Sequence, residues 1–364
     1  MSELPIIAIV VLAGFAAFAM LARRPKASPP SAAARLAANA APAARPDAAG
    51  IGALPDHGGA SAASAASAAC LRLAFGVVHG DETLSGKHLR VLRSVAAALE
   101  QSVQERDYFP RRPLQLPKLL KTLNDSEATR RELAQLIAED PALTSAVLQG
   151  ANSPAYRVAP TPVENIDGAV LLLGTEGLRG LLATTILQPV FQVPRGYFDN
   201  FAAITWERAE RSSAAAGKCT ELVGSDAFVA QILALLKMLA HIVIFRLTME
   251  KYREQPDTLP HAGVFIAAIE LHRARMARLI ASSWKLSPAS LAALAEQESG
   301  LPPAQMGALG RITRVCSLSG ALATLAAHGA QSHAEALALL QGQGLEHASA
   351  LMLWQASSGL RQAH

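Results

Sequence analysis

The chain has 364 residues, of which 51% are apolar and only 5% aromatic, so its cores must be built from Leu, Ala, Val and Ile on closely packed helices. Its formal net charge of +4 is modest for this length and does not indicate a nucleic-acid-binding protein. The three cysteines lack C-x-x-C spacing, which favours a reducing compartment and no cysteine-based metal site.

The N-terminal segment has the composition of a membrane anchor. Residues 4–22 carry no charged side chain and approach the roughly 20 apolar residues that span a bilayer. Arg23, Arg24 and Lys26 follow this run, and the positive-inside tendency then places the rest of the chain in the cytoplasm. We therefore expect residues 1–26 to form a single-pass anchor in the inner membrane, with a cleaved signal peptide as the alternative.

The next two segments differ in composition. Residues 27–70 are mostly Ala, Pro, Ser and Gly, which bury too little apolar surface to fold, so they are predicted to form a disordered linker. Residues 71–104 are predicted to begin with a short extended piece at 71–78 and to continue as an accessory helix. That helix is expected to pack on the core or, alternatively, to bind a partner; its apolar residues recur at Leu89, Leu92, Val95, Leu99 and Val103.

The segment 133–156 combines a helix, a helix restart and a helix stop. Asp140 is expected to cap a new helix through its carboxylate, and Pro141 fits the first helical position. Loss of this cap would cost about 1 kcal/mol. Ser153 precedes a proline, which disfavours the α conformation and ends the helix.

This segment resembles the signature of the HDOD family, the non-catalytic relatives of HD-domain phosphohydrolases. Residues 113–117 are similar to the opening L-P-x-L-P element of that family, and residues 166–174 to its I-x-x-A-I-x-x-L-G helix. The resemblance implies an all-α domain of two helical lobes, which we place at residues 105–345. Residues 346–364 are expected to be a C-terminal tail.

Caps and apolar periodicity predict the individual helices of this domain. They are expected at residues 126–138, 141–152, 164–173, 175–187, 204–216, 226–247, 263–284, 288–298, 303–328 and 333–340. The first four segments lie in the expected first lobe, near residues 105–190, and the second lobe is expected at roughly residues 200–330.

The catalytic relatives hold a metal ion with histidine and aspartate ligands, and the resemblance assigns those positions here. Arg208 stands at the first ligand position, Lys237 and Met238 replace a His-Asp pair, and Ser319 lies near the last aspartate. Two cationic side chains would repel a divalent metal. The resemblance therefore implies a degenerate metal site, and we expect no catalytic residue, no metal and no cofactor.

These observations favour a membrane-tethered, non-catalytic signalling or regulatory module that binds other proteins. The partner is not identified by the sequence. The expected recognition surface is the first lobe, where the cap and the turn after it would present polar groups and an aromatic ring: Asp140, Asn152, Ser153 and Tyr156.

Two alternatives remain at this point. Arg208, Lys237 and His272 could line a cleft that binds a nucleotide or a cyclic dinucleotide through charge-assisted hydrogen bonds. The two cations could instead pair with nearby carboxylates of Glu207, Glu210 or Glu296. The second alternative function is a divergent metal-dependent phosphohydrolase.

Overall fold

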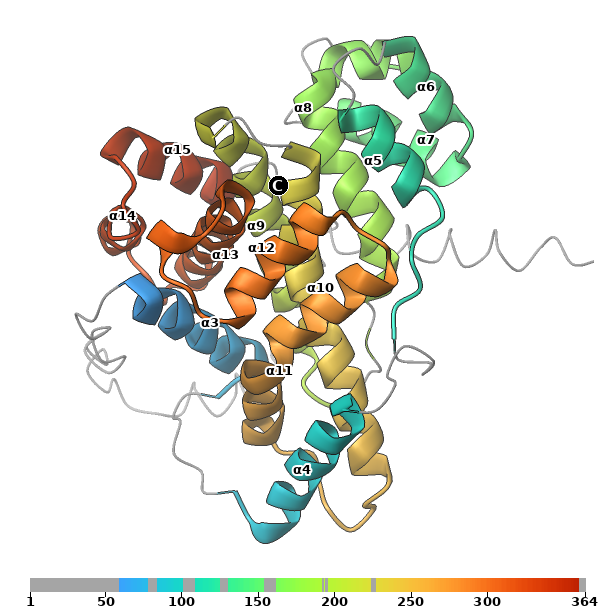
Figure 1. Cartoon of the computed structure of the whole chain (residues 1–364). Helices are drawn as coiled ribbons and strands as arrows, with labels where there is room; N and C mark the ends of the chain where they lie inside the picture. The colour runs from blue at the N-terminus through green and yellow to red at the C-terminus, as the bar shows by residue number, and fades with distance from the viewer. Residues whose placement is uncertain are drawn as a thin grey trace, which may run out of the picture. The chain divides into compact units, whose positions relative to one another are not determined.

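A computed structural model describes residues 59–77, 84–100, 109–124, 130–153, 162–191, 193, 196–223 and 227–359. Every regular element in these ranges is a helix, which confirms the all-α fold class (Figure 1). The expected membrane anchor at residues 4–22, most of the expected linker and Tyr156 lie outside these ranges.

The helices have the following bounds in chain order. They are α3 (Gly59–Phe75), α4 (Gly86–Glu100), α5 (Leu116–Asn124), α6 (Arg130–Ala138), α7 (Pro141–Ala151), α8 (Ile166–Leu187), η2 (Gln188–Phe191), α9 (Asn200–Val223), α10 (Ala227–Arg253), α11 (Ala262–Ser283), α12 (Pro288–Glu298), η3 (Pro303–Gln305), α13 (Ala308–Ala327), α14 (His333–Gln341) and α15 (His347–Ser358).

Local signals predict several helix boundaries correctly. Helix α12 runs from Pro288 to Glu298 as expected, behind the N-cap Ser287, whose Oγ accepts a hydrogen bond from the Ser290 amide at 3.2 Å. The expected helices 164–173 and 175–187 form α8, which is kinked at Gly174 with φ of 62° and ψ of 178°. Glycine adopts this conformation without the strain that a Cβ atom would add.

Helix α3 corrects two sequence-based predictions. Residues 59–70 were expected to be the end of a disordered linker and residues 71–78 an extended piece, but Gly59–Phe75 is helical. Alanine has the highest helix propensity, and α3 gains tertiary contacts with α9, α11 and α13. Its buried residues recur three or four apart on one face: Ala66, Cys70, Leu71, Ala74 and Phe75.

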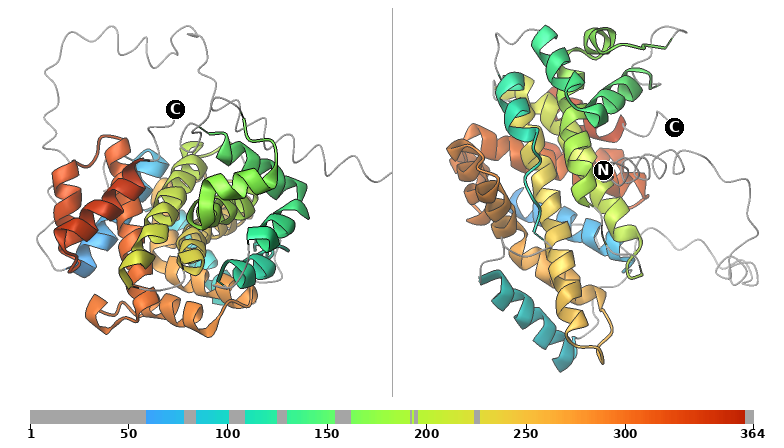
Figure 2. Two further views of the ribbon diagram at one scale, coloured as in Figure 1. Left: turned by 90° about the horizontal axis from the view of Figure 1, so that it is seen from above. Right: turned by 90° about the vertical axis from the view of Figure 1, so that its right-hand side faces the viewer.

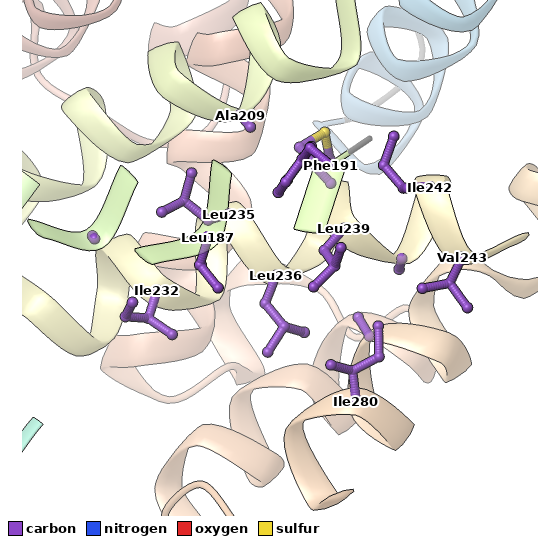
Figure 3. Close-up of a cluster of buried hydrophobic side chains, with 14 of the residues drawn as sticks. Leu187, Phe191, Ala209, Ile232, Leu235, Leu236, Leu239, Ile242, Val243 and Ile280 are labelled. Carbon is purple, nitrogen blue, oxygen red and sulfur yellow. The ribbon is translucent and has the colours of Figure 1, made fainter. Parts of the chain in front are cut away.

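Helix α10 forms the centre of the core. It has the length and hydropathy of a membrane span, but 89% of that window is buried inside the protein. A helix that is apolar on all sides is stable in water only when other helices surround it. Figure 3 shows Leu235, Leu236 and Leu239 of α10 directed toward their neighbours, among them Phe191 and Ile280.

Two hydrophobic clusters hold the folded part together. The larger one extends from α3 to α12 and includes side chains from both expected lobes. The smaller one joins α3, α9 and α10 to α13, α14 and α15. Helices α9 and α10 lie between the α5–α8 group and the α13–α15 group (Figure 1 and Figure 2).

The C-terminal residues are also part of this fold. Residues 346–364 were expected to be a tail, but α15 occupies His347–Ser358 and contacts α9 and α13. Ala350, Leu353 and Trp354 are buried there. The prediction was wrong because a helix of this length shows its apolar face only when its tertiary neighbours are known.

Helices α9 and α13 approach each other closely. A Cβ atom added to Gly320 would lie 2.6 Å from the backbone nitrogen of Ser212 and 2.8 Å from its Cα atom. No side chain fits at that distance, so glycine is required for this packing. The contact brings the α13 backbone against the helix that carries Arg208.

Candidate functional site

The four positions that resemble former metal-ligand positions lie on three neighbouring helices. Arg208 is on α9, Lys237 and Met238 are on α10, and Ser319 is on α13. Helix α9 contacts both α10 and α13. Arg208 is only 5% exposed, whereas Lys237 is half-buried.

Two of these four residues have roles in packing. Met238 belongs to the larger hydrophobic cluster. The Ser319 hydroxyl donates to the Leu353 carbonyl at 3.2 Å and lies 2.8 Å from the Ser357 hydroxyl. Ser319 therefore links α13 to α15.

Arg208 meets another guanidinium group that sequence reasoning missed. Nη1 of Arg208 donates to Oγ of Ser67 at 3.2 Å, and Nη1 of Arg273 donates to the same oxygen at 3.0 Å. One neutral hydroxyl on α3 thus serves guanidinium groups from α9 and α11. Nε of Arg208 is buried and has no hydrogen-bond partner. The sequence suggested a ligand-binding role for His272, the residue before Arg273, but no sequence feature indicated that Arg273 contacts Ser67.

Lys237 is a third basic side chain whose charge interacts with those of Arg208 and Arg273. Burial, together with the positive charges of Arg208, Arg273 and Arg314, lowers the pKa of Lys237 to about 7. Burial also holds the pKa of His241 well below its ordinary value, and the positive charges of Arg208, Arg273 and Lys237 act in the same direction. We refer to Arg208, Lys237 and Arg273 as the cationic cluster.

Glu207, one of the carboxylates expected to neutralise Arg208 or Lys237, binds other groups. Its Oε1 accepts from Nη2 of Arg211 at 2.9 Å, and its Oε2 lies 3.0 Å from Nε2 of His328. Glu207 therefore ties α9 to the residue that follows α13.

The other two expected carboxylates do not neutralise the cationic cluster either. Burial raises the pKa of Glu210 to about 7, so this group is a weak counter-charge. Oε1 of Glu296 accepts from the Gly307 amide at 3.1 Å. Across the described part of the chain, no carboxylate lies within ion-pair distance of the cationic cluster, although Glu270 is near enough to raise the pKa of Arg273.

The donor set does not fit a divalent metal ion. Arg208 and Lys237 are basic side chains at two of the positions that resemble ligand positions, and neither Met238 nor Ser319 supplies the anionic oxygen or imidazole nitrogen that such sites use. Within the described ranges, no group of three or more His, Cys, Asp or Glu side chains has an arrangement that could hold a metal.

His272 lies apart from the cationic cluster. Burial lowers its pKa, and the charged groups that act on it are Arg275 and Glu100 of α4. Its Nε2 atom is buried without a hydrogen-bond partner. Adjacent residues on a helix point in directions about 100° apart, so Arg273 occupies the place in the cluster that the sequence suggested for His272.

The expected recognition surface has structural roles at two of its residues. Oδ1 of Asp140 accepts from the Ala142 amide at 2.8 Å and the Leu143 amide at 3.4 Å, which confirms the helix cap. Asn152 donates to the carbonyls of Leu148 and Val163 at 2.8 Å each and accepts from the Val163 amide at 2.7 Å.

The amide of Asn152 is therefore committed to the turn between α7 and α8. Ser153 is half-buried beside it. Tyr156 lies outside the described residues. The expected role as a recognition surface stays a prediction for Asp140, Asn152, Ser153 and Tyr156. The structure shows that Asn152 also positions the turn.

An open groove of about 480 Å³ lies between α6 and α8. Arg130 and Arg131 line one side, and Asp167, Val170 and Leu171 line the other. Leu171 is 65% exposed. Sequence reasoning missed the groove, although the uninterrupted apolar run around Leu171 is wider than one buried helix face needs.

Comparisons with known proteins point to one family. The sequence profile of the HDOD domain matches residues 109–299, which is more than half of the chain. A presumed signal transduction protein from Marinobacter aquaeolei VT8 has a similar structure at a TM-score of 0.52 and 17% identity, covering 76% of this chain and 66% of that one. No curated protein matches the chain.

Two further crystal structures are similar at lower scores. An HDOD domain protein of unknown function from Geobacter sulfurreducens has 18% identity and a TM-score of 0.47, covering 75% of this chain and 89% of its own. A presumed phosphohydrolase from Shewanella amazonensis SB2B has 20% identity and a TM-score of 0.49, covering 74% and 94%. At these identities the likeness concerns the fold alone.

Proposed function

The chain belongs to the HDOD domain family, and on this premise we propose that it is a membrane-tethered, non-catalytic regulatory module that acts by binding a signalling protein. The observation that carries the proposal is that two basic side chains, Arg208 and Lys237, stand at positions that resemble the metal-ligand positions of catalytic relatives. A hydrolytic metal centre needs ligands that neutralise the ion and acidify its bound water, and two cations oppose both.

The groove between α6 and α8 supports a protein partner. Exposed apolar surface next to basic side chains is typical of a site that receives an apolar anchor flanked by acidic residues. Leu171 would contact the anchor, and Arg130 and Arg131 would pair with the acidic residues. The hydrogen bonds of Asn152 to Val163 hold the end of α7 to the residues before α8.

The tether is proposed from the sequence alone. Residues 1–26 contain the apolar run and its basic flank, and the folded part follows after the linker. The HDOD domain would then be held at the cytoplasmic face of the inner membrane, close to membrane-bound partners.

The test uses the tagged full-length chain, solubilised gently from membranes, with co-purified proteins identified and quantified by mass spectrometry. Leu171→Arg is compared with Leu271→Arg, because both leucines are on helices and similarly exposed, at 65% and 67%. A partner that uses the groove is expected to be lost at least about tenfold with Leu171→Arg and retained with Leu271→Arg.

A chain without residues 1–26 is expected in the soluble fraction, and its persistence in the membrane fraction would contradict the tether. Equal recovery of every co-purified protein with Leu171→Arg and wild type would contradict the proposed groove. Both leucine variants should melt at the wild-type temperature, since neither side chain is part of the core.

A further inference from the structure

No carboxylate in the described ranges forms an ion pair with the cationic cluster. Arg208 and Arg273 share the hydroxyl of Ser67, and Nε of Arg208 has no partner. A buried charge is costly unless it is paired and hydrogen-bonded. The cluster therefore favours any anion that can reach it.

Arg211, one helical turn from Arg208, shows how this protein pairs a buried guanidinium group. Its Nε and Nη2 donate to Oε1 of Glu207 at 3.1 and 2.9 Å, and its Nη1 donates to the Ser357 carbonyl at 2.7 Å. Arg211 is 2% exposed, so its burial is even greater than that of Arg208. The missing counter-charge at Arg208 is thus a local feature of the cationic cluster.

The geometry matches a phosphate group. Two guanidinium groups that converge on one oxygen, with an ammonium nearby, present more donors than a hydroxyl can accept, whereas a phosphate has several anionic oxygens. Guanidinium groups also bind phosphate oxygens in pairs through parallel N–H groups. Ser67 Oγ marks the place that one of these oxygens would occupy.

Helix α3 covers that place. Ala66, Ser67 and Cys70 are buried, and Sγ of Cys70 donates to the Ala321 carbonyl at 3.3 Å. A phosphate group can replace the Ser67 hydroxyl between the two arginines only if α3 moves away. Binding of the anion and docking of α3 therefore compete for the same donors.

We propose that Arg208, Arg273 and Lys237 form a binding site for a phosphate group, and that α3 is a displaceable cover whose Ser67 hydroxyl takes the place of a phosphate oxygen. This inference goes beyond the regulatory role and does not depend on the partner that the α6–α8 groove binds. Because α3 begins within the expected linker, displacement of α3 would lengthen the tether of the folded domain and link the anion to regulation.

The test replaces the Ser67 hydroxyl by a carboxylate. Ser67→Asp supplies an internal anion to both arginines, and Ser67→Asn has the same size without the charge. Full-length wild type and both variants are titrated calorimetrically with inorganic phosphate in phosphate-free detergent buffer. Hydrogen exchange of the amides in Gly59–Phe75 is measured with and without saturating phosphate.

Wild type and Ser67→Asn are expected to bind phosphate and to exchange faster in α3 when it is bound. Ser67→Asp is expected to bind phosphate at least about tenfold more weakly and to exchange more slowly in α3. Arg273→Gln, at a half-buried position, provides a second variant that should lose phosphate affinity even if Ser67→Asp does not fold.

Equal phosphate affinity in Ser67→Asp and Ser67→Asn would overturn the proposal, as would phosphate binding with no change in the exchange of α3. Parallel titrations with a cyclic dinucleotide and with vesicles that contain phosphatidic acid distinguish a soluble nucleotide from a lipid headgroup as the source. Absence of binding by all three probes would also overturn it. Leu171→Arg should bind phosphate as wild type does, because Leu171 is not part of the cationic cluster. The phosphate titrations therefore test this site independently of the partner proposal.

Discussion

The turn between α7 and α8 and the cationic cluster handle their polar groups in opposite ways. Asn152 forms hydrogen bonds to residues four and 11 positions away, and these use both amide N–H groups and the side-chain carbonyl. The hydroxyl of Ser67 joins arginines that are 141 and 206 positions away, and it leaves Nε of Arg208 without a partner.

This difference separates a structural element from a candidate binding site. A turn whose donors and acceptors are satisfied by near neighbours stabilises the backbone and has little left for a ligand. A cluster with unbalanced charge lowers stability, and such groups gather at functional sites. The polar residues that matter for ligand binding are therefore expected in the cationic cluster, whereas the side chain of Asn152 is expected to matter for folding.

Gly320→Ala tests the close packing of α9 and α13 beside the cationic cluster, and it should cause the largest loss of stability. The new Cβ would collide with the backbone of Ser212, so the helices must separate, at a cost of about 3 kcal/mol of unfolding free energy. Chemical denaturation of the full chain measures this. Gly86→Ala is the control, since nothing lies within 4 Å of that position. A loss of stability no greater than in the control would show that the contact can relax.

Asn152→Ala tests the structural role of the turn. It removes three hydrogen bonds and leaves the Val163 amide and carbonyl without that partner, so we expect a loss of about 2 kcal/mol in unfolding free energy. Gln149→Ala is a matched control on the same helix, because the Gln149 side chain is exposed and makes one long bond of 3.4 Å to Ser145. If Asn152→Ala is as stable as wild type, the Asn152 side chain does not stabilise the fold, and its expected role in recognition would be favoured.

Lys237→Met tests whether the unpaired charge of the cationic cluster lowers the stability of the protein, in contrast to the stabilising hydrogen bonds of Asn152. Burial, with Arg208, Arg273 and Arg314 adding to it and Cys316 opposing it, lowers the pKa of Lys237 from 10.5 to about 7 in the folded state. Between these values the unfolded chain holds the proton and the folded chain does not, so wild-type stability rises as pH increases from about 7 to 10.5.

The methionine variant lacks this dependence. It is expected to be more stable than wild type near neutral pH, by on the order of 1 kcal/mol after discounting for partial exposure, and to lose that advantage as the pH approaches the ordinary lysine pKa. Thermal unfolding over this pH range measures the difference. A variant less stable than wild type at neutral pH would mean that the ammonium group is well paired.

Sequence reasoning worked best where the signals were local. The cap at Asp140 and the helix Pro288–Glu298 follow from side chains that bond to backbone groups two or three residues away. The apolar run of α10 was recognised as a helix, and its burial explains why it is apolar on every side. The structure places the four residues at the expected metal-site positions on α9, α10 and α13, and their assignment to a former metal site stays a prediction.

Predictions failed where contacts join distant parts of the chain. Residues 59–70 of α3 were assigned to a linker because their composition offers little apolar surface to bury, yet the small side chains of α3 fit closely against α9 and α13. Helix α15 was assigned to a C-terminal tail. In both helices, the burial of apolar side chains against neighbouring helices supplies stability that the local sequence does not reveal.

The sequence by itself determined the helical fold class, the family and the basic character of positions 208 and 237, because these depend on residue type and short-range spacing. Only the tertiary structure decided that Arg273 joins these two residues and that Ser67 lies between the guanidinium groups. The physical reason is that the charge balance of a buried group depends on every chain segment packed around it, and those segments here come from α3, α9, α10 and α11.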